Sequence, residues 1–186
     1  MSVDTVQAST EERMRKSVEF LKHDLASIRT GRATPALLDR VVVDYYGAPT
    51  SVQSLAAIAA PEPRLITIQP YDRQAMSAIE RAIQKSDLGL TPNNDGTTIR
   101  LVIPQLTDDR RRDLVKLVQK RLEEARVAVR NCRRDAVDTL RREEKEKGIS
   151  SDELHRGQDA LQKLTDRYVG QVDEVGRDKE REIMEP

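Results

Sequence analysis

Four closely spaced arginines are the strongest chemical signal in the sequence. The stretch "ARVAVRNCRRDA" places Arg126, Arg130, Arg133 and Arg134 among small apolar residues. On an α-helix, which turns by about 100° per residue, all four fall within an arc of roughly 100° and form one stripe. We call these four residues the arginine stripe. Their guanidinium groups can donate charge-assisted hydrogen bonds to phosphate oxygens, so we predict that the stripe binds phosphate.

Acidic residues on the same helix offset the stripe only in part. Helix neighbours lie at i±3 and i±4, so Glu123 can pair with Arg126 and Asp138 with Arg134. Arg130 and Arg133 have no acid at these offsets. Placing like charges side by side costs about 0.2–0.5 kcal/mol per pair, a cost that is explained if phosphates supply the missing counter-charge. A solvated helix face is the alternative, and we favour nucleic-acid binding.

The residues around the stripe indicate which nucleic acid it binds. The chain holds no Trp, one Phe and four Tyr, and no aromatic residue lies among the arginines, so we do not expect bases to stack on it as in single-strand binders. A rigid helix with arginines suits recognition of phosphates and shape in folded RNA.

Charge is segregated along the chain, although 32 basic and 32 acidic residues balance overall. Residues 105–134 hold ten basic and five acidic residues, whereas residues 150–186 hold six basic and ten acidic ones. Basic character is therefore concentrated in one helix-length segment, where an anionic polymer would bind.

Motifs of enzymes and metal sites are absent from the sequence. It contains no phosphate-binding or dinucleotide-binding glycine loop, no H-E-x-x-H and no C-x-x-C. His23 and His155 occupy polar helix positions, and Cys132 falls on an apolar row, where a thiol acts as a small core residue. We therefore predict no catalytic residue, no metal and no cofactor.

Prolines divide the chain into helical flanks and a middle block, because seven of the eight lie between residues 35 and 104. Before the block, apolar residues spaced by 4, 3, 4 and 3 predict a first helix. Ser9 and Glu12 form its expected capping box, and Gly31 is its expected stop.

Two further helices are expected after the block. Thr107 can cap a helix over residues 108–147, about 60 Å long, which needs helical partners. Ser150 and Glu153 form a capping box for the last helix, with Ile149 and Leu154 placed for a hydrophobic staple. Three glycines in that helix are expected to make it the softest: Gly157, Gly170 and Gly176. The three amphipathic helices predict a three-helix bundle.

The middle block has the pattern of a small α+β domain. The runs "RVVVDYYG", "RLITIQP" and "TTIRLVIP" predict strands, Asn-Asp-Gly at 94–96 predicts a turn, and Asp72 can cap a helix. We expect a bundle of residues 1–31 and 105–186, with residues 32–104 inserted. The two connections form an expected hinge of Thr30, Gly31, Arg32, Ala33, Ile103, Pro104 and Gln105.

The N-terminal segment "MSVDTVQASTEE" lacks the pattern of a signal peptide, and the longest apolar run, residues 55–60, is too short to span a membrane. The single cysteine fits a reducing compartment. We expect a cytoplasmic monomer that does not bind membranes.

Six segments resemble the bacterial ribosome recycling factor family, in order and across nearly the whole chain. They are "SIRTGRATPALLD", "VDYYGAPT", "SDLGLTPN", "QLTDDRRRDLVK", "ARVAVRNCRRDA" and "QKLTD". The resemblance implies an L-shaped α+β protein, a three-helix bundle with an inserted β/α/β domain. It also implies binding to large-subunit ribosomal RNA and, with elongation factor G and the GTP bound to that factor, splitting of the post-termination ribosome into subunits.

The resemblance assigns roles to individual arginines. It makes Arg133 and Arg130 in "VRNCRRD" the principal contacts to ribosomal RNA. It implies supporting contacts from Arg29, Arg32 and Arg111.

Other classes of function stay open beside a translation factor that binds ribosomal RNA. One is a helical scaffold or chaperone cofactor whose bundle binds protein, and an enzyme is the third alternative. An RNA-binding translation factor should bind large ribosomal subunits with an affinity that falls as salt rises, whereas a protein scaffold or an unrelated enzyme should not bind them.

Overall fold

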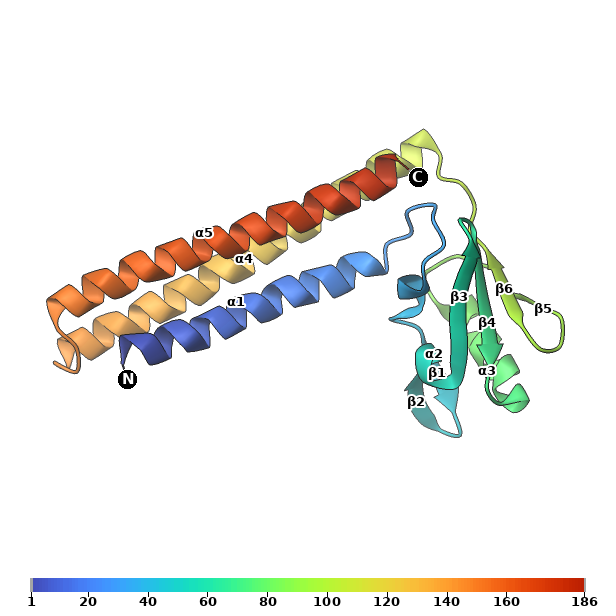
Figure 1. The fold of residues 1–186 in the computed structure, drawn as a ribbon, viewed down its shortest axis with the longest axis horizontal. Helices are drawn as coiled ribbons and strands as arrows, with labels where there is room; N and C mark the ends of the chain where they lie inside the picture. Colours follow the sequence, from blue (N-terminus) through green and yellow to red (C-terminus); the bar gives the residue numbers. More distant parts are fainter. Residues whose placement is uncertain (1, 186) are drawn as a thin grey trace. The chain divides into compact units, whose positions relative to one another are not determined.

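The computed structural model describes residues 2–185, which form two units (Figure 1). The helical unit contains the chain up to Leu25 together with Val115–Arg181, and the α+β unit contains Ala26–Leu114 and the residues from Glu182. Three long helices and a small sheet-containing unit confirm the predicted α+β class. The boundaries expected at 31/32 and 104/105, and the hinge there, stay predictions.

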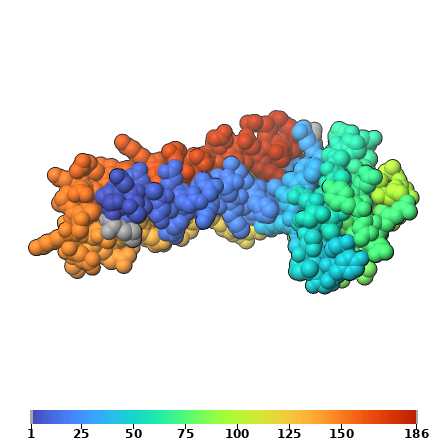
Figure 2. Space-filling view, turned by 60° about the horizontal axis from the view of Figure 1, so that its bottom comes forward, coloured from blue at the N-terminus to red at the C-terminus, as the bar shows by residue number. Residues whose placement is uncertain are grey.

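The helical unit is built from most of three long helices: α1 (Val3–Ala26), α4 (Asp108–Lys145) and α5 (Ser151–Met184). The first turns of α4, up to Leu114, and the end of α5, from Glu182, belong to the α+β unit. Each helix buries one apolar row, and on α4 this row includes Val118, Val129 and Leu140, all at most 1% exposed. Hydrogen bonds between polar side chains also connect neighbouring helices. Tyr168 on α5 donates a hydrogen bond to Glu11 on α1 (3.1 Å), and Figure 2 shows these two helices beside each other.

The first helix begins earlier and ends earlier than expected. The Ser2 hydroxyl accepts a hydrogen bond from the Thr5 amide (3.1 Å), and the helix starts at Val3, so the capping box predicted at Ser9 is wrong. Buried Val6 explains the difference, because it extends the apolar row by two turns before Met14. The helix ends at Ala26, well before Gly31.

The predicted caps of the other two helices are confirmed. The Thr107 hydroxyl accepts from the Arg110 amide (3.1 Å) at the start of α4. At the start of α5 the Glu153 amide donates to the Ser150 hydroxyl (3.1 Å), and the Ser150 amide donates to the Glu153 carboxylate (3.4 Å). Ile149 packs in the same apolar cluster as Leu154, as a hydrophobic staple requires.

Two of the three glycines in α5 allow close helix packing. A Cβ atom added to Gly176 would overlap the Leu122 side chain of α4, and one added to Gly157 would lie 2.8 Å from Leu140 Cδ1. At Gly170 it would meet no atom of the described chain within 4 Å. The bundle therefore depends on the missing side chains at residues 157 and 176, whereas Gly170 only lowers helix propensity.

This contrast predicts opposite effects for two identical substitutions. Gly170→Ala should raise the free energy of unfolding by about 1 kcal/mol, the usual difference in helix propensity. Gly176→Ala gains the same propensity but overfills the contact with Leu122, which costs about 1–3 kcal/mol. Urea denaturation of both variants measures the difference. Equal stabilisation by the two substitutions would show that α4 and α5 do not approach closely at Gly176.

The α+β unit contains two antiparallel sheets. A hairpin pairs β1 (Val42–Tyr45) with β2 (Ala48–Ser51). The larger sheet has the order β3-β4-β6-β5. Its strands are β3 (Ala56–Glu62), β4 (Leu65–Pro70), β5 (Asn93–Asn94) and β6 (Ile99–Val102). The short helical segments are η1 (Pro35–Leu38), α2 (Val52–Leu55), η2 (Arg73–Ala75) and α3 (Met76–Lys85).

Alternation along the strands directs one set of side chains into the core of this unit. Ile66 and Ile68 on β4 and Ile99 on β6 are fully buried, and Ile79 and Ile83 of α3 join their cluster.

The predicted Asp72 cap is present, because its carboxylate accepts from the Gln74 amide (2.9 Å) at the start of η2, which leads into α3. The predicted turn at 94–96 is also present, and hydrogen bonds from the Thr98 and Thr97 amides lower the pKa of Asp95 to about 2.

Both connecting segments are fixed at one place in the α+β unit. The Ala33 amide donates to the Pro63 carbonyl (2.7 Å), and the Ile103 amide donates to the Arg64 carbonyl (2.8 Å). Pro63 and Arg64 form the turn between β3 and β4. Gly31, just before the first anchor, has φ +83°, a conformation that favours glycine.

Candidate nucleic-acid interface

The structure places the arginine stripe on one continuous helix, as predicted, and gives its members different partners. All four residues lie within α4 in the helical unit. Arg126 and Arg130 line a shallow groove between α4 and α5, together with Asp173, Gly176 and other residues of both helices. The stripe is therefore part of a surface that two helices build.

Arg126 is held by internal ion pairs. Its Nη2 lies 2.7 Å from the Asp173 carboxylate on α5, and its Nη1 lies 3.2 Å from Glu123 on its own helix. The hydrogen bond to Asp173 raises the pKa of the Arg126 guanidinium, and Glu123 acts in the same direction. With its side chain only 22% exposed, Arg126 connects α4 to α5, and most of its charge is compensated.

Arg130 has an acidic partner that the helix-offset argument missed. Its Nη1 lies 3.6 Å from the Glu123 carboxylate, so the expectation that Arg130 lacks an acid is wrong. Glu123 is seven residues earlier, which is about two helical turns and therefore the same helix face. The side chain of Arg130 is half exposed, and the carboxylate it contacts is shared with Arg126. Such an exposed pair contributes about 0–1 kcal/mol, so a phosphate can replace it.

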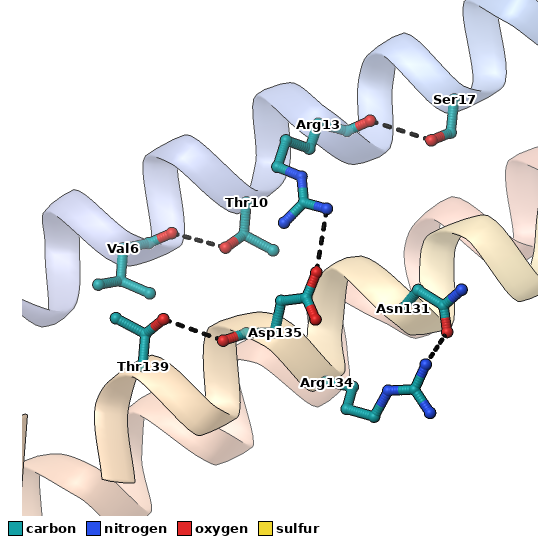
Figure 3. A network of polar contacts seen from close by, with 8 residues as sticks. All are labelled: Val6, Thr10, Arg13, Ser17, Asn131, Arg134, Asp135 and Thr139. Atoms are coloured by element: carbon teal, nitrogen blue, oxygen red, sulfur yellow. Dashed lines mark hydrogen bonds and ion pairs between the residues drawn. The ribbon is translucent and has the colours of Figure 1, made fainter. Parts of the chain in front are cut away.

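Arg133 and Arg134 have neutral partners. Arg133 Nη1 donates to the Gln162 side-chain oxygen on α5 (2.9 Å), and Arg134 donates to the Asn131 side-chain oxygen, as Figure 3 shows. Among the described residues, no carboxylate forms an ion pair with either arginine, so the pairing of Asp138 with Arg134 expected from helix spacing is wrong. The positive charge that remains uncompensated is therefore concentrated at the end of the stripe nearer the α4–α5 turn.

The nearest acid in the sequence does not compensate that charge. Asp135 follows Arg134 directly, but its carboxylate accepts a hydrogen bond from Arg13 on α1 (3.1 Å). Figure 3 shows Asp135 and Arg13 pointing toward each other between the two helices, while Arg134 points away from α1. One face of α4 thus binds α1 and another presents the stripe.

The three supporting arginines implied by the resemblance belong to the α+β unit. Arg29 is half-buried, Arg32 donates to the Glu185 carbonyl (3.1 Å), and Arg111 Nη1 lies 3.9 Å from Asp108. Within residues 2–185, the buried side-chain nitrogens or oxygens without a hydrogen-bond partner are the Nε atoms of Arg111 and Arg133. Both atoms are donors, and both belong to residues predicted to contact RNA.

Other functional groups do not gather into a site in the described part of the chain. Cys132 is buried as a free thiol, and His23 and His155 are exposed. Among residues 2–185, no cluster of three His, Cys, Asp or Glu side chains could hold a metal ion. Every described helix is too short or too polar to cross a membrane.

Sequence reasoning missed the residues of α5 that contact the stripe. Gln162 and Asp173 are 11 residues apart, about three turns, and so lie on the same face of α5. That spacing is visible in the sequence. The partner of each residue is not, because it depends on the register between α4 and α5.

Comparison with known proteins identifies the family. The family model described as "Ribosome recycling factor" matches residues 21–184. The chain belongs to the ribosome recycling factor family. The identification made from the six sequence segments is thus confirmed, and the chain is placed among factors of translation and ribosome recycling.

Individual relatives match over nearly their full length. The ribosome-recycling factor of Syntrophomonas wolfei is 55% identical over 183 residues, which cover 98% of this chain and 99% of the relative. The ribosome-recycling factor of Halalkalibacterium halodurans is 57% identical over 175 residues, covering 94% and 95%.

Solved structures share the fold. A solution structure of the ribosome recycling factor matches with a TM-score of 0.81 and 41% identity, covering 100% of this chain and 99% of the other. A second match is the T. thermophilus ribosome recycling factor bound, with the E. coli elongation factor G, to the E. coli post-termination complex. It has a TM-score of 0.70 and 45% identity, and covers 98% and 99% of the two chains.

Proposed function

We propose that this protein binds large-subunit ribosomal RNA of the post-termination ribosome through the arginine stripe and, with elongation factor G and GTP, splits the ribosome into subunits. The RNA-binding part of this proposal rests on one observation: the positive charges of Arg133 and Arg134 are uncompensated, because their hydrogen-bond partners are neutral amide oxygens. The similar factor bound with elongation factor G to a post-termination complex supports the choice of partners.

The members of the stripe have unequal roles in this proposal. Arg133, Arg130 and Arg134 contact phosphates, whereas Arg126 chiefly holds α4 against α5 through Asp173. Arg29, Arg32 and Arg111 make supporting contacts. The protein acts in the cytoplasm as a monomer, has no catalytic residue or cofactor, and leaves GTP hydrolysis to elongation factor G.

Splitting of purified post-termination ribosomes by this protein tests the proposal. Light scattering should fall when the protein, elongation factor G and GTP are all present, because subunits scatter less than whole ribosomes. Omission of the protein, of the elongation factor or of GTP should each prevent the fall. Splitting by elongation factor G and GTP alone at the same rate would contradict the proposed function.

A hinge at the two connections is part of the proposal, because motion between units is the default for joined domains and hinges lie at a few loop residues. The connections are anchored in the α+β unit at Ala33 and Ile103. In this proposal, force passes between the bundle and the inserted domain through these short segments.

Lengthening both connections should separate binding from splitting. Insertion of Gly-Gly-Ser after Arg32 and after Pro104 leaves the anchors and the stripe intact but lets the two domains move independently. We expect unchanged affinity for large subunits and at least a roughly tenfold slower splitting rate. The same insertion after Lys147, an exposed residue between α4 and α5, is the control. Splitting at the control rate would show that the connections transmit no force.

A further inference from the structure

We propose that Gln162, in the "QKLTD" segment of α5, is a positioning residue that orients Arg133 for phosphate while leaving its charge free. This inference rests on the proposed RNA-binding role of Arg133. The segment contributes to the family resemblance, but neither the stripe nor the hinge gives it a role. In the structure, two polar residues of this segment, Asp166 and Gln162, are linked by a hydrogen bond, and Gln162 is linked in turn to Arg133 of the stripe.

The chain of hydrogen bonds fixes the Gln162 amide in one orientation. Its side-chain oxygen accepts from Arg133 Nη1 (2.9 Å), and its side-chain nitrogen donates to the Asp166 carboxylate one turn later (2.9 Å). A carboxylate at residue 166 can only accept, so the amide nitrogen must face it and the amide oxygen must face the arginine. Asp166 thus makes Gln162 a dedicated acceptor for Arg133.

The same contact limits the freedom of the guanidinium group. Arg133 is half-buried, and its Nε is enclosed without a partner in the described chain. Its Nη1 is bound to Gln162, whereas its Nη2 has no hydrogen-bond partner among residues 2–185 and can donate to a phosphate oxygen. An arginine that is already ordered loses less conformational freedom on binding, which favours affinity.

The two contacts between α5 and the stripe differ in charge. Asp173 contacts Arg126 and compensates its charge, whereas Gln162, on the same face of α5, contacts Arg133 with a neutral oxygen. A carboxylate at residue 162 would compete with RNA phosphate for the arginine. An amide keeps the geometry of the contact without this competition.

A double-mutant cycle tests whether Gln162 acts through Arg133. The wild type, Gln162→Met, Arg133→Ala and the double variant are titrated with purified large ribosomal subunits at one salt concentration. Methionine has a similar length and cannot accept the hydrogen bond at ordinary strength. We expect Gln162→Met to weaken binding about fivefold in the wild type, the effect of one hydrogen bond, and less than about twofold in the Arg133→Ala background. Gln158→Met, one turn earlier on α5, should leave affinity unchanged.

A charge variant supplies a readout that a purely structural role would not change. Gln162→Glu should lower the slope of log affinity against log salt by about 1, because the new carboxylate compensates one phosphate-binding charge. Gln162→Met should keep the wild-type slope, since the arginine retains its charge. Thermal melts followed by circular dichroism confirm that each variant is folded.

The outcomes separate this inference from the function on which it rests. If Arg133→Ala weakens binding but Gln162→Met has no effect, or has the same effect in both backgrounds, the positioning role is overturned. An unchanged salt slope for Gln162→Glu also overturns it. If Arg133→Ala itself leaves affinity unchanged, the RNA-binding role of Arg133 fails first.

Discussion

Val129→Asp should unfold the helical unit. Val129 is 0% exposed on the apolar row of α4, next to the stripe residue Arg130. A carboxylate there would be buried without a partner, at a cost of several kcal/mol that is comparable to the whole stability of many domains. Far-ultraviolet circular dichroism should show a large loss of helix signal or of melting temperature.

A neighbouring valine provides the matched control. Val127 lies on the same helix but is 45% exposed, so Val127→Asp should change the melting temperature little. Equal melting temperatures for the Val129→Asp and Val127→Asp variants would mean that the faces of α4 are assigned wrongly, and with them the exposure of the stripe.

The double substitution Arg130→Ala with Arg133→Ala should abolish most of the affinity for large ribosomal subunits. A hydrogen bond to a charged group contributes about 1.5–3 kcal/mol, so two such contacts account for roughly a hundredfold or more in affinity. Stability should change little, because Arg130 makes an exposed ion pair and Arg133 a single neutral hydrogen bond.

Co-sedimentation with purified large subunits measures this loss. The control is Arg15→Ala with Lys22→Ala, which removes the same charge from exposed ion pairs on α1. If the stripe variant and the control variant bind with equal affinity, binding depends on net charge and not on the stripe. A folded stripe variant with wild-type affinity would exclude the stripe from binding altogether.

Local patterns were sufficient to predict most helix boundaries. The Thr107 cap and the Ser150–Glu153 capping box depend on residues within one turn, and the structure contains both. Ser9 and Glu12 match the same pattern inside a helix, and the Ser2 cap and the buried Val6 show that the helix begins earlier. A capping pattern therefore identifies a helix start only where no apolar row precedes it.

The first hairpin shows a local signal that was too weak to detect. The run "RVVVDYYG" forms a strand as predicted, β1, but the hairpin turn at Tyr46 and Gly47, which have φ of 51° and 80°, and the strand β2 that follows it were not predicted. Two residues with positive φ typically have the sequence Asn-Gly or Asp-Gly, and tyrosine in this conformation is uncommon.

The candidate site could be predicted only in part, for a geometric reason. The spacing along α4 places the four arginines on one face whatever the tertiary structure. Whether Arg126 and Arg133 keep a free charge depends on Asp173 and Gln162 of α5, whose distances from α4 are set by helix register. The close approach at Gly176 is part of that register, and the sequence alone gives it only as a loss of helix propensity.

The salt dependence of binding to purified large subunits tests the central claim most directly. Log affinity should fall linearly with log salt for the wild type, because phosphate contacts release counterions. For the variant with Arg130→Ala and Arg133→Ala, the slope should be shallower by about 1.5, the value for two lost phosphate contacts at about 0.7–0.9 each. Identical slopes for the two proteins would contradict the claim that the arginine stripe binds ribosomal RNA.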